Sequence, residues 1–489
     1  MLELKPFTPG KTPVDTLVLL CAGDHVFYRH QALADMVSLA GDLPEFQGDS
    51  GEMVTFYDRT ELRSRRVVLI GVGKAAEITA ETWRQSAGKA VGLAVEKQFG
   101  TLAIAVPEVG EDTLPATVTA MLEGGCLANH RFQAYKSEIK HTPLKKIVFL
   151  MPPDKRRRFG RLPRRVEDIC RAALTARDWV NMPSNDKRPQ QFVATVKTAA
   201  GKEGLTVSVL NAQQLKRKKM GAILAVAAGS DSPPALMLLE HKPAKAKATA
   251  TIALVGKGVT FDSGGINLNP SGSLEDMKID MAGAAAVAAA LIAAARTNVP
   301  IHLIGAIPVV ENMVSGGATR PGDVIRTYSG KTVEIGNTDA EGRLILADAL
   351  AYVIDRYHPD TVADLATLTG ACVVALGEKI AGVFSPDSDL TDEIVQAGET
   401  VHERCWPMPL PDDYNELLKS DIADMKNIGS TRWGGAITAA LFLSAFVDDT
   451  RWVHIDIAGP AFAKKGGDYC GPGATGFGVR LLLEWLSRV

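Results

Sequence analysis

The stretch TIALVGKGVTFDSGG, residues 251–265, indicates how the larger part of this chain folds. Its apolar first half has the composition of a buried strand, and its second half ends that strand with charged residues and glycines. An alanine-rich segment of helical length follows at 280–297, and another apolar run comes at 301–310. Such alternation of strand and helix is typical of α/β proteins, in which helices cover the faces of a sheet.

The same alternation extends in both directions along the chain. Further strand-like runs lie at 205–211, 235–241, 361–368 and 452–459, and helical patterns lie at 190–202, 342–357, 389–403, 434–447 and 475–488. The first part of the chain has strand-like runs at 15–23, 65–73, 101–109 and 145–153, with helical patterns at 75–97 and 116–132. We therefore predict two α/β domains, a smaller N-terminal one and a larger C-terminal one with a mixed central sheet.

A basic stretch, DKRRRFGRLPRR at 154–165, separates the two parts. A helical run follows it at 166–181 and ends at a turn that contains proline. We predict an N-terminal domain at 1–165, a connecting helix at 166–185 and a larger C-terminal domain at 186–489.

The charge balance excludes a general attraction to polyanions. The 489 residues include 54 Lys and Arg against 56 Asp and Glu, which is a formal net charge of −2. We therefore expect neither nucleic acid nor an anionic membrane as a partner. Two local basic runs, at 154–165 and 215–219, leave a DNA-binding regulatory role as an alternative.

Cysteine usage and the first residues favour a reducing compartment. The six cysteines are scattered, and no pair has the CxxC spacing of a thiolate zinc site. The sequence MLELKPFTPGK has a glutamate and two prolines where a signal peptide needs an apolar core. The longest strongly apolar run, 281–295, is shorter than the about 20 residues of a membrane span. We expect a cytoplasmic protein.

The first of two acidic segments is VGKGVTFDSGGINLNPSGSLEDMKIDMAGAAA, residues 255–286. Lys257 and Asp262 follow the strand that begins this region, and Asp280 precedes the alanine-rich helix. The glycines that follow Asp262 favour a close approach of the backbone to a ligand. Considered alone, Asp280 also fits a helix cap, and a single carboxylate at a strand end is most often solvated.

The second acidic segment is EIGNTDAEGRLILADAL, residues 334–350. Asp339, Glu341 and Arg343 are spaced two residues apart, so an extended backbone would point all three to one face. Carboxylates that lie close together repel one another and raise each other's pKa unless cations keep them ionised. Two divalent ions about 3.5–4 Å apart are a common solution, and they suit hydrolysis by an activated water.

These two segments resemble the signatures of the leucyl (cytosol) aminopeptidase family, above all in VGKGVTFDSGG (255–265) and NTDAEGRL (337–344). Further agreement comes from DMKIDMAGAAA (276–286), ADLATLTGACVVALG (363–377), DMKNIG (424–429), GGAITAALFL (434–443) and HIDIAGPAF (454–462). The resemblance covers about 170–489 strongly, and 1–160 only in size and in α/β alternation. It implies a metal-dependent exopeptidase that removes N-terminal residues, leucine-like ones preferred, from peptides.

The resemblance also implies which residues hold the metals. The tightly bound ion is expected at Lys257, Asp262, Asp280 and Glu341, and the more exchangeable ion at Asp262, Asp339 and Glu341. A lysine ligand must be a neutral amine, so the ion has to displace its proton. Zn²⁺ or Mn²⁺ is expected, with Mg²⁺ or Co²⁺ as alternatives, because oxygen-rich ligands do not select one metal.

Other roles follow from the same resemblance. The free amino group of the substrate would bind one metal, and a water that bridges the two metals would attack the scissile carbonyl. Arg343 matches the residue that holds a bicarbonate acting as general base. Four further positions are expected to bind the substrate: Met277, Asn337, Thr367 and Gly370. The family resemblance implies a homohexamer.

One position departs from the family pattern. The family has a lysine four residues after the second glycine of FDSGG, where it polarises the scissile carbonyl, and this chain has Asn269. Loss of one oxyanion donor typically costs about 10²–10³ in rate. Two alternatives follow: an active peptidase that tolerates Asn269 as a catalytic residue, or a weakly active or inactive relative that binds metal.

Overall fold

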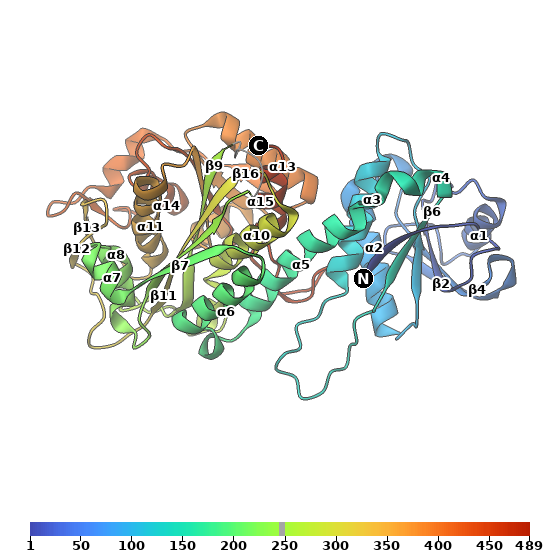
Figure 1. The fold of residues 1–489 in the computed structure, drawn as a ribbon, viewed down its shortest axis with the longest axis horizontal. Helices are drawn as coiled ribbons and strands as arrows, with labels where there is room; N and C mark the ends of the chain where they lie inside the picture. The colour runs from blue at the N-terminus through green and yellow to red at the C-terminus, as the bar shows by residue number, and fades with distance from the viewer. Residues whose placement is uncertain (244–249) are drawn as a thin grey trace. The chain divides into compact units, whose positions relative to one another are not determined.

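The computed structural model describes residues 1–243 and 250–489, which form two compact units (Figure 1). The first unit comprises Met1–Arg171 with Lys464–Pro472, and the second comprises Ala172–Ala463 with Gly473–Val489. No local pattern in the sequence predicts that 464–472 belongs with the first unit. The chain passes from the first unit to the second along α5 (Leu162–Asn181), close to the predicted connecting helix. The boundaries at 165 and 185 stay predictions.

The first unit contains a six-stranded sheet in the order β1-β6-β5-β2-β4-β3. Its strands are β1 (Leu2–Pro6), β2 (Val14–Cys21), β3 (Met53–Arg59), β4 (Ser64–Gly71), β5 (Leu102–Ala105) and β6 (Ile147–Met151). Its helices are α1 (Gln31–Gly41), α2 (Ala80–Glu96), α3 (Leu114–Ala128) and α4 (Pro153–Arg156). All neighbouring strands are parallel except β3, which pairs antiparallel with β4. The four predicted strands and the two predicted helices are present, and β1, β3, α1 and α4 were not predicted.

The second unit contains a larger mixed sheet in the order β16-β15-β18-β14-β9-β11-β8-β7, with β10 paired to β11. The strands are β7 (Thr206–Asn211), β8 (Ala235–His241), β9 (Thr251–Gly256), β10 (Gly258–Asp262), β11 (His302–Asn312), β14 (Thr361–Ala366), β15 (Ala381–Phe384), β16 (Cys405–Pro407) and β18 (Arg451–Asp456). The middle of the sheet is parallel and consists of β18, β14, β9 and β11. Strand β8 runs antiparallel to both β11 and β7. The predicted mixed sheet is therefore confirmed.

Helices cover both faces of this sheet (Figure 1). One face carries α6 (Pro189–Lys202), α10 (Ala282–Thr297) and α15 (Val479–Leu486), with α13 (Ser388–Val401) against α15. The other carries α8 (Gly221–Val226), α11 (Glu341–Tyr357) and α14 (Gly435–Ser444), with α7 (Ala212–Arg217) against α8. Because both faces are covered, strand β9 is buried almost throughout, as parallel central strands usually are.

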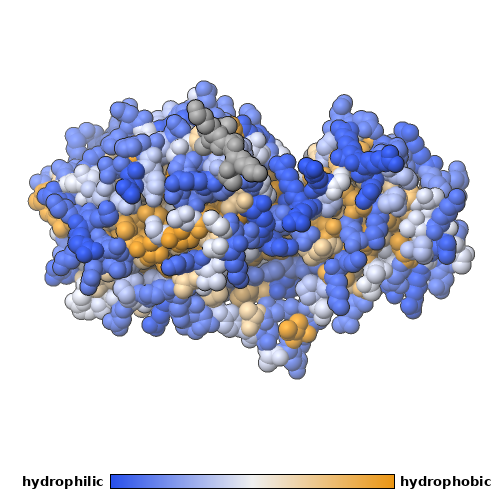
Figure 2. Space-filling model, viewed as in Figure 1, coloured by the Kyte–Doolittle hydropathy of each residue, from blue (hydrophilic) through white to orange (hydrophobic). Residues whose placement is uncertain are grey.

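Shorter elements complete the second unit. They are α9 (Ser271–Leu274), α12 (Gly370–Leu376), the 3₁₀ turns η6 (Met277–Ile279) and η7 (Asp412–Leu418), and the short strands β12 (Val324–Arg326), β13 (Thr332–Glu334), β17 (Met425–Lys426), β19 (Phe462–Ala463) and β20 (Gly473–Ala474). Hydrophilic residues predominate on the face shown in Figure 2, with a band of apolar residues on the larger unit.

One stretch has the length and apolar composition of a membrane span, but it belongs to the core. It is Met277–Thr297, which contains η6 and α10, and 83% of its most apolar window is buried inside the protein. Helix α10 packs against β9, β11 and β14, and its alanines allow that close approach. A helix that is apolar all round and buried is typical of a protein core.

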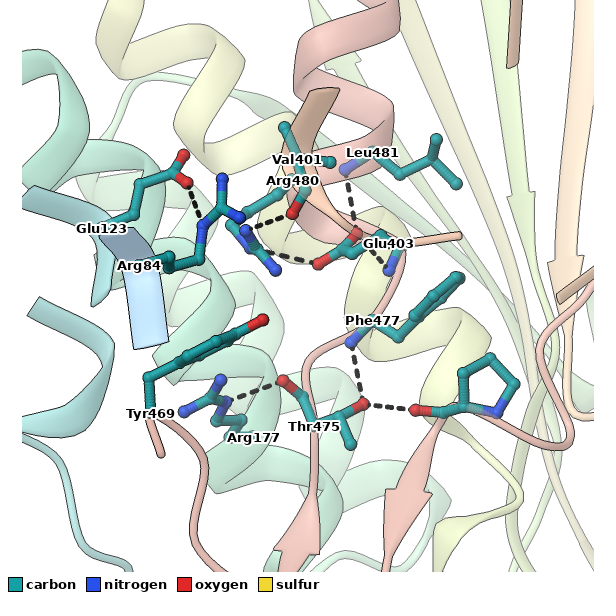
Figure 3. Close-up of polar contacts among 12 residues, drawn as sticks. Arg84, Glu123, Arg177, Val401, Glu403, Tyr469, Thr475, Phe477, Arg480 and Leu481 are labelled. Atoms are coloured by element: carbon teal, nitrogen blue, oxygen red, sulfur yellow. Dashed lines mark hydrogen bonds and ion pairs between the residues drawn. The ribbon is translucent and has the colours of Figure 1, made fainter. Parts of the chain in front are cut away.

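A buried ion pair fixes the start of the last helix, α15. Glu403 accepts hydrogen bonds from the backbone N–H groups of Gly478 and Leu481, both at 2.9 Å (Figure 3). The guanidinium of Arg480 lies 3.2 Å from the Glu403 carboxylate and donates to the carbonyl of Val401 (Figure 3). A carboxylate at a helix N-terminus satisfies N–H groups that have no partner within the helix.

Candidate metal centre

Three carboxylates converge beyond the C-terminal ends of the parallel strands. Asp262 ends β10, Asp280 lies between η6 and α10, and Glu341 begins α11. Each offers one oxygen within 4.8 Å of the others, and all three side chains are buried. Ligand sites in open α/β sheets are usually found at this edge, because the loops that leave the parallel strands meet there.

Lys257 lies at the centre of the carboxylates. It joins β9 to β10, and its Nζ is 2.7 Å from Asp280 Oδ1 and 2.8 Å from Glu341 Oε1. The same nitrogen donates a hydrogen bond to the carbonyl of Thr367, at 2.8 Å. This lysine is therefore shared among three segments that are far apart in the sequence.

Asp280 does not cap the alanine-rich helix, although the sequence left that role open. The N-cap position of α10 is Met281, and it makes no side-chain hydrogen bond. Asp280 instead accepts hydrogen bonds at Oδ1 from Lys257 and from the Thr367 hydroxyl, at 2.7 and 2.8 Å. Its Oδ2 is buried and has no hydrogen-bond partner among the residues that the structure describes. An unpartnered buried oxygen is costly, and a cation at this oxygen would remove that cost.

The prediction of an extended backbone across 339–343 is wrong. Helix α11 begins at Glu341, so Glu341 and Arg343 belong to its first turn and Asp339 to the turn before it. The carboxylate of Glu341 is favoured there because the N-terminal end of a helix carries partial positive charge. Local spacing did not reveal where the helix starts.

Gly342 makes room for Lys257. A Cβ atom at Gly342 would lie 2.5 Å from Cε and 2.8 Å from Nζ of Lys257. Any side chain at this position would therefore displace the lysine from its carboxylates. Gly342 was not a predicted site residue, since its importance depends on Lys257, which is distant in the sequence.

Two asparagines hold Asp262 and Asp339. Asn312 donates a hydrogen bond from Nδ2 to Asp262 Oδ1 at 2.8 Å. Asn269 donates from Nδ2 to Asp339 Oδ1 at 2.5 Å. Asp339 also receives support from Asn337, whose Oδ1 accepts its backbone N–H at 2.8 Å. The close carboxylate group among the described residues does not include Asp339.

Arg343 is buried beside the same centre. Its Nη1 donates to the carbonyl of Asn427 at 2.8 Å, while its Nε is buried and finds no hydrogen-bond partner within 1–243 and 250–489. Asn427 in turn donates from Nδ2 to the carbonyl of Asn337 at 2.7 Å and so ties this loop to the acidic segment. Asn427 was not a predicted site residue, although it lies within the DMKNIG segment that carries part of the resemblance.

The remaining predicted substrate-binding positions lie on nearby elements. Met277 begins η6 and is half-buried, Thr367 follows β14 and is buried, and Gly370 begins α12 and is exposed. Thr367 is linked to the acidic centre through both its hydroxyl and its carbonyl. Their role toward a substrate stays a prediction.

The buried carboxylates of this site repel one another unless cations are present. Burial raises the pKa of Asp262 and of Asp280, and neighbouring carboxylates raise both further. Burial and the Glu341 carboxylate also raise the pKa of Asp339, to about 6. Burial alone would lower the pKa of the Lys257 ammonium, but the carboxylates around it outweigh burial and the net shift is upward. One lysine cannot balance three buried carboxylates, and divalent cations would supply the missing charge.

The residues present therefore fit a site for divalent metal ions. Buried carboxylate oxygens, one of them without a partner, are ligands that Mg²⁺, Mn²⁺ and Zn²⁺ all accept. Burial lowers the pKa of Arg343 to about 10, so it remains a cation at neutral pH, and its free Nε suits an anion.

Two basic runs, at 154–165 and 215–219, left DNA binding open as an alternative. Most residues of the run at 154–165 are exposed. Lys155 and Arg158 both contact Glu111, at 2.9 and 3.3 Å. Arg164 lies 3.9 Å from Asp168. Neighbouring carboxylates thus offset part of the positive charge at 154–165.

Comparison with known proteins adds an independent line of support. A family model described as "Cytosol aminopeptidase family, catalytic domain" matches residues 174–483, and one described as "Cytosol aminopeptidase family, N-terminal domain" matches residues 28–138. A "Probable cytosol aminopeptidase" of Chlorobaculum tepidum is 43% identical over 481 residues, which is 94% of this chain and 93% of that protein. Another, from a Geobacter species, is 40% identical and covers 100% of this chain and 99% of its own.

Solved structures agree with these relatives. A mutant of tomato leucine aminopeptidase superposes with a TM-score of 0.89 at 33% identity, covering 100% of this chain and 96% of that one. The bottromycin maturation enzyme BotP in complex with Mn superposes with a TM-score of 0.84 at 33% identity, covering 97% and 99% of the two chains.

Proposed function

This chain belongs to the cytosol aminopeptidase family and is a metal-dependent aminopeptidase, and we propose that its acidic centre holds two divalent ions for the removal of leucine-like N-terminal residues from peptides. The observation that carries the proposal is the buried group of Asp262, Asp280 and Glu341 around Lys257. The Mn complex of BotP supports Mn²⁺ as one ion that this architecture accepts.

We assign one ion to Lys257, Asp262, Asp280 and Glu341, and the other to Asp262, Asp339 and Glu341. Bound there, the ions would polarise the scissile carbonyl and lower the pKa of a water so that it becomes nucleophilic at neutral pH. Lys257 would give up its proton in order to act as a ligand, since only a neutral amine has a lone pair. The carboxylates would stay ionised, because the positive charge of the metal ions would replace that of the Lys257 ammonium.

Two further residues would act on the reacting groups. Arg343 has a buried Nε that no described residue bonds, which favours the binding of an anion such as bicarbonate as general base. Asn269 offers an amide donor at the position where the family has a lysine. An amide lacks the positive charge of lysine, so we expect slower turnover than in relatives that keep the lysine.

The experiment that tests the function is release of leucine from a leucyl chromogenic amide and from a short leucyl peptide. The protein is freed of metal by a chelator and then supplied with Zn²⁺, Mn²⁺, Mg²⁺ or Co²⁺. We expect metal-dependent turnover that chelation abolishes, and none in the Glu341→Ala variant. An N-acetylated leucyl peptide is the control for a free amino terminus and is expected to stay intact.

An alternative outcome would identify a relative without activity. Protein that binds two ions per chain but turns over neither substrate with any metal would refute the proposed peptidase activity and favour a metal-binding role. The bond between Asn269 and Asp339 is the observation that keeps this alternative open.

We also propose that the protein is cytoplasmic and assembles as a homohexamer. The location rests on the relatives above, which carry the word cytosol in their names, and the assembly rests on the resemblance to the family alone. Measurement of the mass in solution by light scattering tests the assembly, and any value other than six times 52.1 kDa would contradict it.

A further inference from the structure

Asn312 and Asp262 lie side by side on two neighbouring parallel strands. It is the last residue of β11, and Asp262 is the last residue of β10. The two residues are direct partners in the register of the sheet. Both are buried, with 4% and 5% of their surface exposed. The end of β11 therefore reaches the acidic centre, although β11 contributes no carboxylate to it.

The orientation of the Asn312 amide is determined by its neighbours. Its Nδ2 lies 2.8 Å from Asp262 Oδ1 and 3.1 Å from the carbonyl oxygen of Thr338. Both neighbours are acceptors, so the group that faces them must be the NH2 rather than the carbonyl. Each of the two N–H bonds is thereby used.

These two hydrogen bonds join the two acidic segments. Asp262 Oδ1 also accepts the backbone N–H of Gly264 at 2.9 Å, so this oxygen is held by two donors. Thr338 immediately precedes Asp339, and its hydroxyl donates to the carbonyl of Gly264. Asn312 thus connects the Asp262 carboxylate to the backbone that carries Asp339.

We propose that Asn312 is a positioning residue of the metal site, which holds Oδ1 of Asp262 and so would leave its second oxygen, Oδ2, available to an ion. The inference rests on the proposed function, because it requires that Asp262 is a ligand. Groups that hydrogen-bond to metal ligands orient them, and their loss typically costs about 10–100-fold in metal affinity. Asn312 would act through Asp262 and would not touch the substrate.

The side chain at this position must be a donor. In Asn312→Asp the new carboxylate would face the Asp262 carboxylate and the Thr338 carbonyl, with no N–H between them. Asn312→Ala removes the donors without adding a charge. If only the shape of the residue mattered, the aspartate variant would be the milder of the two.

The test is titration of metal-free protein with Co²⁺, followed by calorimetry and by the visible absorption of the bound ion, which responds to its ligands. Asn312→Ala is expected to bind Co²⁺ about 10–100-fold more weakly than the unaltered protein and with a changed spectrum. Asn312→Asp is expected to lose at least as much affinity. If the aspartate variant does not fold, the alanine variant carries the test alone.

Asn129→Asp is the matched control. Asn129 is a buried asparagine in the first unit, 6% exposed, that bonds both to the N–H and to the carbonyl of Leu144. Its replacement is expected to lower the melting temperature and to leave Co²⁺ affinity and spectrum unchanged. A purely structural role of Asn312 would give that same result.

The outcomes separate the two proposals. If the unaltered protein binds Co²⁺ and Asn312→Ala binds it with the same affinity and spectrum, the role of Asn312 is refuted and the proposed function stands. If the unaltered protein binds no Co²⁺, the metal-dependent function is refuted, and the role of Asn312 is refuted with it.

Discussion

The side-chain amide of Asn269 donates a hydrogen bond to Oδ1 of Asp339, with 2.5 Å between the two atoms. The family pattern has a lysine at this position, which is expected to act on the substrate. In this chain the side chain instead contacts a predicted metal ligand. Its hydrogen bond lowers the pKa of Asp339, although burial has the larger effect and the net shift is upward. Asn269 therefore helps to keep Asp339 ionised.

Asn269→Lys is expected to raise kcat by about tenfold or more, up to the about 10²–10³ that one oxyanion donor provides. The physical reason is that a longer, charged side chain reaches the position where negative charge develops. The measurement is steady-state hydrolysis of a leucyl amide with saturating metal. Asn269→Gln is the control, since it adds length without charge and should not increase kcat. An equal increase in both variants would contradict the role of charge.

Glu341→Ala is expected to lose both ions, whereas Asp339→Ala is expected to lose only one. Glu341 lies among the buried ligands of the centre, and Asp339 is assigned to the exchangeable ion alone. The measurement is metal content by elemental analysis after dialysis against a low metal concentration. Asp348→Asn serves as control: in the described part of the chain this buried carboxylate accepts hydrogen bonds from the backbone N–H groups of Ala222, Ile223 and Tyr328, and its variant should keep both ions. Equal metal content in all variants would refute the ligand assignment.

Gly342→Ala should inactivate the enzyme, although alanine normally suits a helix better than glycine. The added Cβ would lie 2.5 Å from Cε of Lys257, so the lysine must move away from Asp280 and Glu341. We expect metal affinity to fall at least tenfold, because the displaced Lys257 would no longer be oriented as a ligand.

The matched control for that variant is Gly92→Ala. Gly92 lies in the middle of α2, and a Cβ there meets no atom within 4 Å. This substitution should leave activity unchanged and stabilise the protein by about 0.5–1 kcal/mol, the usual gain from glycine to alanine inside a helix. If Gly342→Ala binds metal normally, the observed position of Lys257 is not needed for metal binding.

Glu403→Ala is expected to destabilise the second unit by about 3–5 kcal/mol, because it leaves the Arg480 guanidinium buried without its carboxylate. The N-terminal N–H groups of α15 would lose their acceptor as well (Figure 3). Urea unfolding measures the change. Glu416→Ala breaks an exposed pair with Lys419, 67% and 70% exposed, and should cost no more than about 1 kcal/mol. Similar costs for the two variants would contradict the importance of burial.

Local patterns predicted most of the secondary structure of both units. Strands such as β9 and β14 and helices such as α10 and α11 lie within a few residues of their predicted bounds. Strand and helix periodicities are properties of short segments, and the central strands are apolar because helices cover both of their faces. The longer elements that were not predicted are β1, β3 and α1 in the first unit and β10, β15, β16, α7, α8 and α12 in the second. Most of them are short, so they contain too few residues to show a clear period.

The sequence by itself determined the fold class, the family and the segments that carry the acidic residues, because each of these is encoded in contiguous runs such as VGKGVTFDSGG and NTDAEGRL. Only the tertiary structure decided which groups meet. Asn269 and Asp339 are 70 residues apart and Asn312 and Asp262 are 50 apart, yet each pair shares a hydrogen bond. Gly342, in α11, matters because Lys257 reaches it from the distant junction of β9 and β10. Contacts of this kind arise where parallel strands end together, and the order of the strands in a sheet is set by packing of the whole domain rather than by any single segment.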